Sequence, residues 1–230
     1  YYNESMVILN RCIKSVATQE GLSIVGHIIV ADTNERSKRK HFPSGAFQLI
    51  NLNCNHHDAG ATPRAIGAIS AFSQGYDAVA FLDADNCYET NHLRLMIEHC
   101  QMNKCDLVSA TRNIYSSFDN QFLYTDTIES NGQDFCDTNC LFMTRTLMPL
   151  MTHWITSKDL YIAGDRVFWN LVCSKEDVKR MHCQTPTVNY YTKWAWHFQY
   201  AKQPIPDDSI WMKKDPHGKF TVHKHKENTQ

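Results

Sequence analysis

The fold of this chain is best predicted from the stretch Asp77-Ala-Val-Ala-Phe-Leu-Asp83-Ala84-Asp85-Asn86. An unbroken apolar run, Ala78 to Leu82, ends there in two aspartates. A short apolar run bounded by polar residues predicts a strand that is buried on both faces, as in a parallel sheet. The two acids then lie at the carboxyl end of the strand, where open α/β sheets bind their ligands.

Two interpretations of Asp83 and Asp85 follow from this position. On a continuing strand, residues two apart share a face, so the carboxylates repel each other unless a cation lies between them. A hard divalent ion, Mg²⁺ or Mn²⁺, that also holds phosphate oxygens would satisfy them. Alternatively, the strand simply ends in a turn, where Asp and Asn are favoured. The stretch alone leaves both interpretations open.

Length and composition restrict the class of protein. A chain of 230 residues is long enough for one sizeable α/β domain with its own core. With 43% hydrophobic and 20% charged residues, the composition is that of an ordinary globular protein. The net charge of −1 gives no overall field that would attract nucleic acid, so no nucleic-acid partner is expected.

The cysteines and the hydropathy pattern help to predict the cellular compartment of the protein. The nine cysteines are an odd number without a CxxC pair, which favours free thiols in a reducing compartment; pairing or metal binding by Cys136 and Cys140 is the alternative. No apolar run reaches the roughly 18 to 20 residues that span a bilayer, and no signal peptide is visible. We therefore expect a cytoplasmic protein, with peripheral association with a membrane left open.

Helical and strand patterns alternate along the first half of the chain. Ser5, Thr62 and Thr90 are the expected N-caps of three helices. The patterns predict helices over 6–19, 62–74 and 90–103 and strands over 24–30, 47–52, 77–83 and 106–111. This order is typical of a doubly wound sheet. The alternation of helices and strands breaks after Arg112, because residues 113–137 suit a long functional loop or short strands. The remaining patterns predict a strand at 140–143, helices at 144–154 and 164–173, and a strand at 185–192.

Five short motifs resemble those of family 2 glycosyltransferases and occur in the order of that family. They are Tyr2-Asn3-Glu4 before the first helix, Ile28-Ile29-Val30-Ala31-Asp32, Gly60-Ala61-Thr62-Pro63-Arg64-Ala65 with Gly67, Phe81-Leu82-Asp83-Ala84-Asp85 and Ala163-Gly164-Asp165-Arg166-Val167-Phe168. The fourth matches the DxD motif. Together the matches cover residues 1 to about 192.

The resemblance implies a GT-A fold: a Rossmann-like, mostly parallel central sheet flanked by helices, with a more irregular acceptor-side C-terminal half. It implies one domain over 1–230. Residues 1–112 would bind a nucleotide sugar, 113–212 would carry the acceptor and catalytic residues, and 213–230 would form a basic tail containing histidines. The first strand of the family has no counterpart before Tyr2, so we expect that strand to be missing from this sequence.

The resemblance also implies a donor site for a nucleoside-diphosphate sugar. Asp85 would bind Mn²⁺ or Mg²⁺ and, through it, the diphosphate, while Asp83 would lie against the ribose or support the metal. Asp32 would lie near the base and Arg64 would reach toward the nucleotide, although a solvated helix residue is an equal alternative for Arg64. The remaining nucleotide-sugar residues implied are Tyr2, Asn3, Glu4 and Ala84.

For catalysis the resemblance implies Asp165 as the general base that activates a hydroxyl of a glycan or lipid-linked acceptor, with inversion of the anomeric configuration. An N-cap role is the alternative for Asp165. His197, in the sequence Trp194-Ala195-Trp196-His197, is the first candidate for a further metal ligand, ahead of His223 and His225. Membership of an aromatic cluster is the alternative for His197.

The sequence departs from the family pattern at three positions. Ala31 replaces the first acid of an acid pair, Ala65 replaces an asparagine, and Gly164 replaces the glutamate before Asp165. Ala31 and Gly164 keep a non-catalytic module on the same fold open. A retaining GT-A enzyme is the alternative if no carboxylate lies opposite the diphosphate. A nucleotidyltransferase also uses acids at a sheet edge, but the Gly-rich, basic loop of that class is not visible here.

Overall fold

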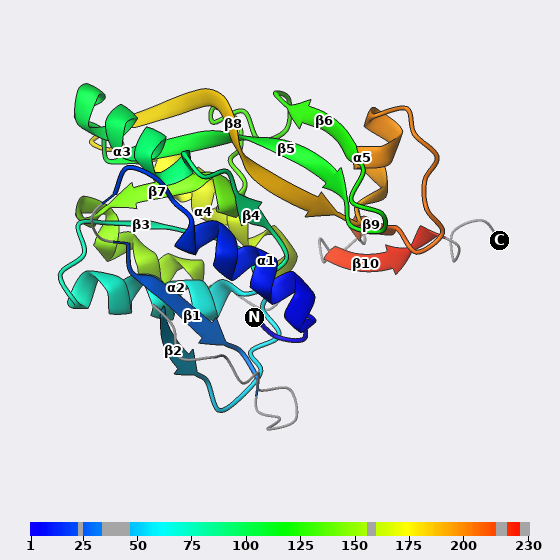
Figure 1. Ribbon diagram of the computed structural model, residues 1–230, viewed down its shortest axis with the longest axis horizontal. Coiled ribbons are helices and arrows are strands. Elements are labelled where there is room, and N and C mark those ends of the chain that lie inside the picture. The colour runs from blue at the N-terminus through cyan, green and yellow to red at the C-terminus, as the bar shows by residue number, and fades with distance from the viewer. Residues whose placement is uncertain (23–24, 34–46, 156–159, 215–219, 226–230) are drawn as a thin grey trace.

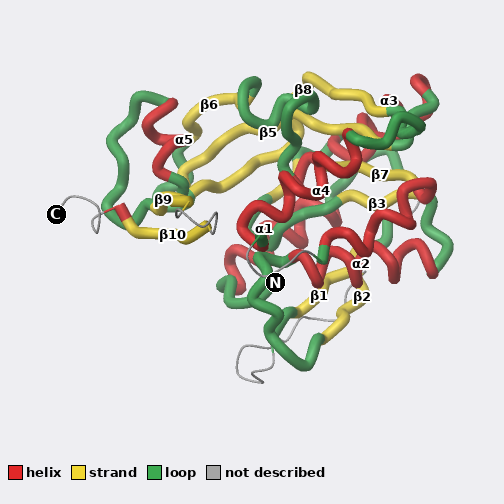
Figure 2. The backbone as a smooth tube through the Cα atoms, turned by 180° about the vertical axis from the view of Figure 1, so that it is seen from behind, coloured by secondary structure: helices red, strands yellow, loops and turns green. Residues whose placement is uncertain are grey.

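The computed structural model describes residues 1–22, 25–33, 47–155, 160–214 and 220–225. The basic segment 35–45 and His217 lie outside these ranges. Figure 1 shows most of the helices gathered in one part of the molecule, while β5, β6 and β8 extend away from it toward α5, β9 and β10. The same arrangement is seen from behind in Figure 2.

A mixed sheet forms the centre of the described structure. Its strands are β3 (Ala78–Ala80), β7 (Leu141–Thr144), β5 (Leu107–Ser116), β8 (Arg180–Thr192) and β4 (Cys87–Tyr88), in that spatial order, with β6 (Phe122–Asp126) paired to β5. Within this sheet β5 and β8 are parallel, whereas the other pairs are antiparallel. The expectation of a mostly parallel sheet is therefore wrong. Strand β7 lies antiparallel between β3 and β5, and a short 3₁₀ turn, Thr138–Cys140, leads directly into it.

Two smaller sheets accompany the central one. Strands β1 (His27–Ala31) and β2 (Phe47–Asn51) form a parallel pair, and β9 (Ile210–Lys214) and β10 (Phe220–Lys224) form an antiparallel pair that crosses the predicted boundary at residue 213. The chain also begins beside β1. The amino group of Tyr1 donates to the carbonyl of Val30 (2.7 Å), and the Asp32 N–H donates to the carbonyl of Tyr1 (2.9 Å). These bonds hold Tyr2 and the residues after it close to Asp32.

The opening strand is shorter than predicted. Regular pairing ends at Ala80, and the Asn86 N–H donates to the Asp83 carbonyl (3.0 Å), which closes a turn over residues 83–86. The turn interpretation is thus confirmed, and the two aspartates do not share the face of a continuing strand. A turn places each carboxylate independently, so this result does not exclude a ligand site.

The predicted strand over 106–111 is too short, because β5 continues to Ser116; the hairpin that it forms with β6 agrees with the short strands allowed for residues 113–137. The polar side chains of this segment have partners across the sheet. Asn113 accepts a hydrogen bond from Thr125 (2.8 Å), and three carboxylates surround Arg112. Polar residues can be buried in a strand when their hydrogen bonds are satisfied in this way.

Helix boundaries were predicted better than their caps. The helices are α1 (Met6–Ala17), α2 (Ala61–Ser73), α3 (His92–Asn103), α4 (Gly164–Cys173) and α5 (Ala195–Tyr200), whereas Arg145–Trp154 is a 3₁₀ helix, η3, and Tyr161–Ala163 another, η4. Ser5 caps α1 as expected, accepting from the Ile8 N–H (3.4 Å). Thr62 instead lies inside α2, where its N–H donates to Asp58 (2.8 Å), and Thr90 precedes α3 without capping it.

The hydrophobic core lies between the central sheet and the helices α2, η3 and α4. Trp154 is fully buried there, stacked on Phe168 with ring centroids 4.0 Å apart and packed against Phe81 at 5.5 Å. All nine cysteines are free thiols, as the sequence predicted. Among the described helices none is long and apolar enough to cross a bilayer.

Candidate functional site

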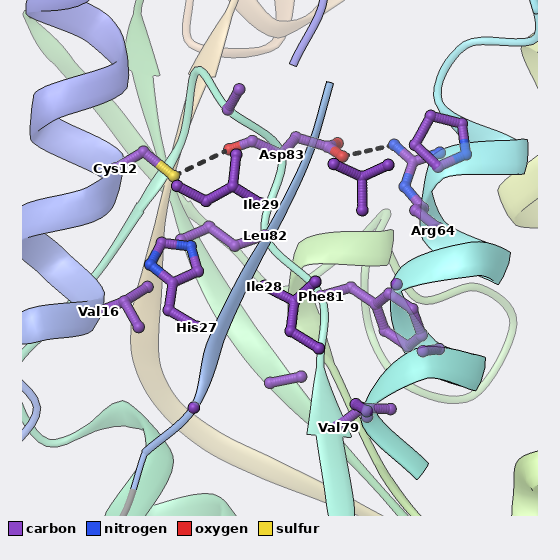
Figure 3. Close-up of a pocket in the computed structure, with 18 of the residues that line it drawn as sticks. Cys12, Val16, His27, Ile28, Ile29, Arg64, Val79, Phe81, Leu82 and Asp83 are labelled. Carbon is purple, nitrogen blue, oxygen red and sulfur yellow. Dashed lines mark hydrogen bonds and ion pairs between the residues drawn. The ribbon is translucent and has the colours of Figure 1, made fainter. Parts of the chain in front are cut away.

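A cavity of about 1320 Å³ lies between α1, α2, β1 and β3. Its interior is apolar: Figure 3 shows Ile28 and Ile29 of β1 opposite Val79 and Leu82, with Val16 of α1 at one side. Burial in this interior lowers the pKa of His27 to about 4, so this imidazole is neutral at pH 7. The interior therefore offers no charge to a phosphate, and polar chemistry is confined to the opening.

Five of the charged residues that line the cavity belong to the motifs, and we call them the polar mouth: Glu4, Asp32, Arg64, Asp83 and Asp85. They come from four separate segments of the chain. Of the residues expected in the donor site, Tyr2 and Ala84 also line the cavity, while Asn3 does not. The structure thus brings together nearly all of the side chains that the motifs singled out.

Asp83 is held by two neighbours. Its Oδ1 accepts from Nη2 of Arg64, as Figure 3 shows, and its Oδ2 accepts from Nδ2 of Asn139 (3.1 Å). Burial alone would disfavour the charge on Arg64, but the Asp83 carboxylate beside it raises the pKa of the guanidinium. Arg64 also donates to the carbonyl of Ala59 (2.9 Å), so it is not the solvated helix residue of the alternative interpretation.

Asp85 has a different environment. Removal from water and the nearby carboxylates of Asp83 and Glu4 raise the pKa of Asp85 to about 7, although its side chain reaches solvent at the mouth. Its backbone is fixed by Arg11, whose Nη2 donates to the Asp85 carbonyl (2.6 Å) and whose guanidinium stacks on Tyr191. Arg11 therefore fixes the backbone at Asp85, while Lys193 lowers the pKa of its carboxyl group by less than its other surroundings raise it.

Asp32 is buried and paired with a histidine. Its Oδ1 contacts Nδ1 of His56 (2.6 Å), and the His56 backbone N–H also donates to the carboxylate (3.3 Å). The expected role of Asp32 near the base is compatible with its place in the cavity wall. His56 belongs to the loop between β2 and α2, in which His57 and Ala59 have positive φ angles of 54° and 53°.

Asp165 lies in the first turn of α4 and is not part of the cavity wall. Burial, with a further contribution from Asp137, raises the pKa of its carboxyl group to about 6, although Arg166 and Arg64 act in the opposite direction. Its Oδ1 accepts from the N–H of Arg166 (2.7 Å), whereas no side chain caps α4, so the alternative N-cap role does not apply.

His197 has protein partners on both ring nitrogens. Nδ1 contacts the Thr192 hydroxyl (2.6 Å) and Nε2 contacts Oε2 of Glu129 (3.1 Å), and the residue is buried beside Tyr124, Tyr190 and Trp196. A metal could bind only if one of these contacts broke, so the structure favours the aromatic-cluster alternative. His223 and His225 likewise contact Thr221 and Trp211.

Glu129 connects His197 to a second group of charges, which we call the Arg112 cluster: Arg112, Asp126, Glu129 and Asp137. The Arg112 guanidinium contacts each of the three carboxylates at 2.8 to 2.9 Å and is almost fully buried. Burial would raise the pKa of Glu129, but its partners His197, Arg112 and Arg166 lower it to about 2. All three acids therefore have a positive partner within the chain.

The polar mouth has the donor chemistry that a hard divalent ion requires. Carboxylate oxygens suit Mg²⁺ and Mn²⁺, and Mg²⁺ is commonly held by one or two carboxylates together with substrate phosphates. Removal from water, followed by the carboxylates of Asp83 and Glu4, raises the pKa of Asp85, and a cation bound there would act in the opposite direction. Among the described residues no group of three or more His, Cys, Asp or Glu forms a complete metal site. The fit is therefore to an ion shared with a bound diphosphate.

Comparison with known proteins identifies the family. The model for glycosyl transferase family 2 matches residues 1–163, well over half of the chain. The chain belongs to glycosyltransferase family 2. The matched range ends just before Asp165. No curated protein matches the sequence.

Solved structures support the same fold. S. aureus TarS 1–349 in complex with UDP superimposes with a TM-score of 0.60 at 13% identity, covering 87% of this chain and 60% of that one. The complex of the same TarS fragment with UDP-GlcNAc gives a TM-score of 0.60 at 12% identity, over 83% of this chain and 56% of that one. The chain thus spans less than two thirds of these structures, and the likeness concerns the fold.

Three residues of the site were not found from the sequence: Arg11, His56 and Asn139. Each acts through a partner more than 20 positions away, which local patterns do not reveal. The run Asn55-His56-His57-Asp58 was a usable signal for His56, because polar residues gather there just before a helix.

Proposed function

We propose that this family 2 glycosyltransferase transfers a sugar from a nucleoside-diphosphate sugar to a hydroxyl group of a glycan or lipid-linked acceptor. The observation that carries the proposal is the polar mouth, where Asp85, Asp83 and Glu4 line one cavity and the carboxylates of Asp83 and Glu4 help to raise the pKa of Asp85. A divalent ion, Mn²⁺ or Mg²⁺, would supply positive charge between Asp85 and the diphosphate of the donor. Because the TarS structures contain UDP and UDP-GlcNAc, a uridine nucleotide is the first donor to test.

In this mechanism the residues of the mouth bind and orient the donor. Asp85 would hold the ion, which neutralises charge that grows on the leaving diphosphate. Asp83, fixed by Arg64, would bind the ribose or support the ion, and Asp32 would line the pocket for the base. These roles use side chains whose positions are set before the donor binds, which limits the cost of organising the site.

Asp165 is the proposed general base. A base works best when its pKa is close to the working pH, and burial raises the pKa of this carboxyl group to about 6. It would accept the proton of the acceptor hydroxyl while the oxygen attacks the anomeric carbon from the side opposite the diphosphate. That geometry inverts the anomeric configuration.

The proposal is tested by measuring hydrolysis and transfer of UDP-sugars with Mn²⁺, for the native chain and for Asp85→Ala and Asp165→Ala. We expect Asp85→Ala to lose metal-dependent nucleotide binding. Asp165→Ala should keep binding and lose turnover by about 10²- to 10⁴-fold, the usual contribution of a general base. Unchanged turnover in both variants would exclude this mechanism.

A further inference from the structure

Asn139 lies between two carboxylates in the interior of the protein and has no role in the function proposed above. It belongs to the 3₁₀ turn Thr138–Cys140 that precedes β7, and its side chain is fully buried. On one side it contacts Asp83 of the polar mouth, and on the other Asp137 of the Arg112 cluster. Asn139 therefore connects the polar mouth to the Arg112 cluster through hydrogen bonds.

Every polar atom of the Asn139 side chain has a partner. Oδ1 accepts from the Asp83 backbone N–H (2.6 Å), while Nδ2 donates to Oδ2 of Asp83 (3.1 Å) and to Oδ1 of Asp137 (2.8 Å). This pattern requires one acceptor and two donors on one planar group, which a primary amide provides and a carboxylate does not. The opposite orientation of the amide would point its oxygen at two carboxylates, so the partners fix the orientation.

Hydrogen bonds to Asp137, which is itself paired with Arg112, also fix the position of Asn139. Asp137 Oδ1 also accepts the Asn139 backbone N–H (2.9 Å), and Asp137 Oδ2 accepts from Nη1 of the buried Arg112 (2.8 Å). A side chain held at its backbone and at its amide has little rotational freedom. Asn139 can therefore hold Asp83 in a single orientation.

We propose that Asn139 is a positioning residue of the donor site, which fixes Asp83 and the turn that carries Asp85. This inference rests on the proposed function. Asn139 binds both the N–H and the carboxylate of Asp83, and the carbonyl of Asp83 accepts the Asn86 N–H that closes the turn (3.0 Å). Asp83 is thus held at three points, so that Oδ1 faces Arg64 while Asp85 projects into the mouth.

The test replaces the amide group of Asn139 in two ways. Asn139→Asp is nearly isosteric, but it sets a third carboxylate against those of Asp83 and Asp137. Asn139→Ser is smaller and removes the second donor. We expect both variants to weaken Mn²⁺-dependent binding of UDP, measured by calorimetry, by about 10- to 100-fold, as is usual when a residue supporting a metal ligand is lost. Asn113→Asp, on β5 with Asn189 and Thr125 as partners, is the matched control and should bind as the native chain does.

Each outcome separates the two proposals. If the native chain does not bind UDP with Mn²⁺, the proposed function fails. If it binds and either folded Asn139 variant binds equally well, the positioning role is overturned. If both variants lose their cooperative thermal transition, Asn139 is required for folding and not for positioning, and the inference is likewise overturned.

Discussion

The polar mouth and the Arg112 cluster both bring several carboxylates together, but they differ in how the charge is balanced. In the Arg112 cluster the guanidinium contacts all three acids, and the pKa of Glu129 falls to about 2. In the polar mouth Arg64 pairs with Asp83, while the pKa of Asp85 rises to about 7. The chain neutralises its own charge in one place and leaves it uncompensated in the other.

This difference distinguishes acids paired with a cation inside the chain from an acid whose pKa is raised by its surroundings. An acid paired inside the chain stabilises the fold, whereas an acid left facing others of like charge destabilises it unless something binds. The uncompensated group lies at the opening of a cavity, where a cation and a diphosphate have access. The pKa of Asp165 responds to both groups: Asp137 of the Arg112 cluster raises it, and Arg64 of the polar mouth lowers it.

The largest expected effect comes from removing the positive charge of the Arg112 cluster. Arg112→Met leaves three carboxylates without their main partner and should lower the free energy of unfolding by about 3 to 5 kcal/mol, as measured by urea denaturation. The control is Arg94→Met, which removes an exposed pair with Glu98 and should cost about 0.5 kcal/mol or less. Equal losses in the two variants would show that the cluster has no special role in stability.

A smaller effect is expected from protonating Asp165. Because its pKa in the folded protein is about 6, the carboxylate that accepts a proton is lost as the pH falls below 6. At saturating donor and acceptor, turnover should then fall by about tenfold per pH unit below that value. The measurement is a pH profile of kcat for the native chain. A profile that stays level between pH 7 and pH 5 would contradict the assignment of Asp165 as the base.

The smallest expected effect is that of Asp85→Asn on the melting temperature of the chain without metal or nucleotide. The pKa of Asp85 is higher in the folded chain, about 7, than the roughly 3.9 expected when unfolded, so its ionisation disfavours the folded state at high pH. Asp85→Asn should therefore melt at a higher temperature than the native chain at pH 8. The difference should shrink as the pH falls through 7 and disappear near pH 4. An Asp85→Asn variant that is less stable at pH 8 would show that the charge is compensated after all.

The sequence predicted the parts of the molecule that depend on local patterns. Ser5 and the start of α4 at Gly164 were identified because capping and helical periodicity are short-range. The turn after Leu82 was one of two interpretations that its Asp and Asn residues left open. Most of the residues predicted for the donor site line one cavity, because the family motifs lie in separate but ordered segments that the fold brings together.

The parts that could not be predicted depend on contacts between distant segments. The direction of β7 is set by its neighbours in the sheet, and no feature of Leu141–Thr144 reports it. Arg112 appeared to end a strand because its three partners lie 14 to 25 positions further along. His197 resembled a metal ligand for the same reason, since its contact with Glu129 spans 68 positions.

The most direct test of the central claim is calorimetric titration with UDP at pH 7.5, with and without Mn²⁺, of the native chain, Asp85→Asn and the exposed control Asp177→Asn. If the uncompensated charge of Asp85 is a metal-diphosphate site, the native chain and the control bind UDP only with Mn²⁺, and Asp85→Asn loses at least about tenfold in affinity. Binding of UDP that is independent of Mn²⁺, or equal in all three proteins, would contradict the account.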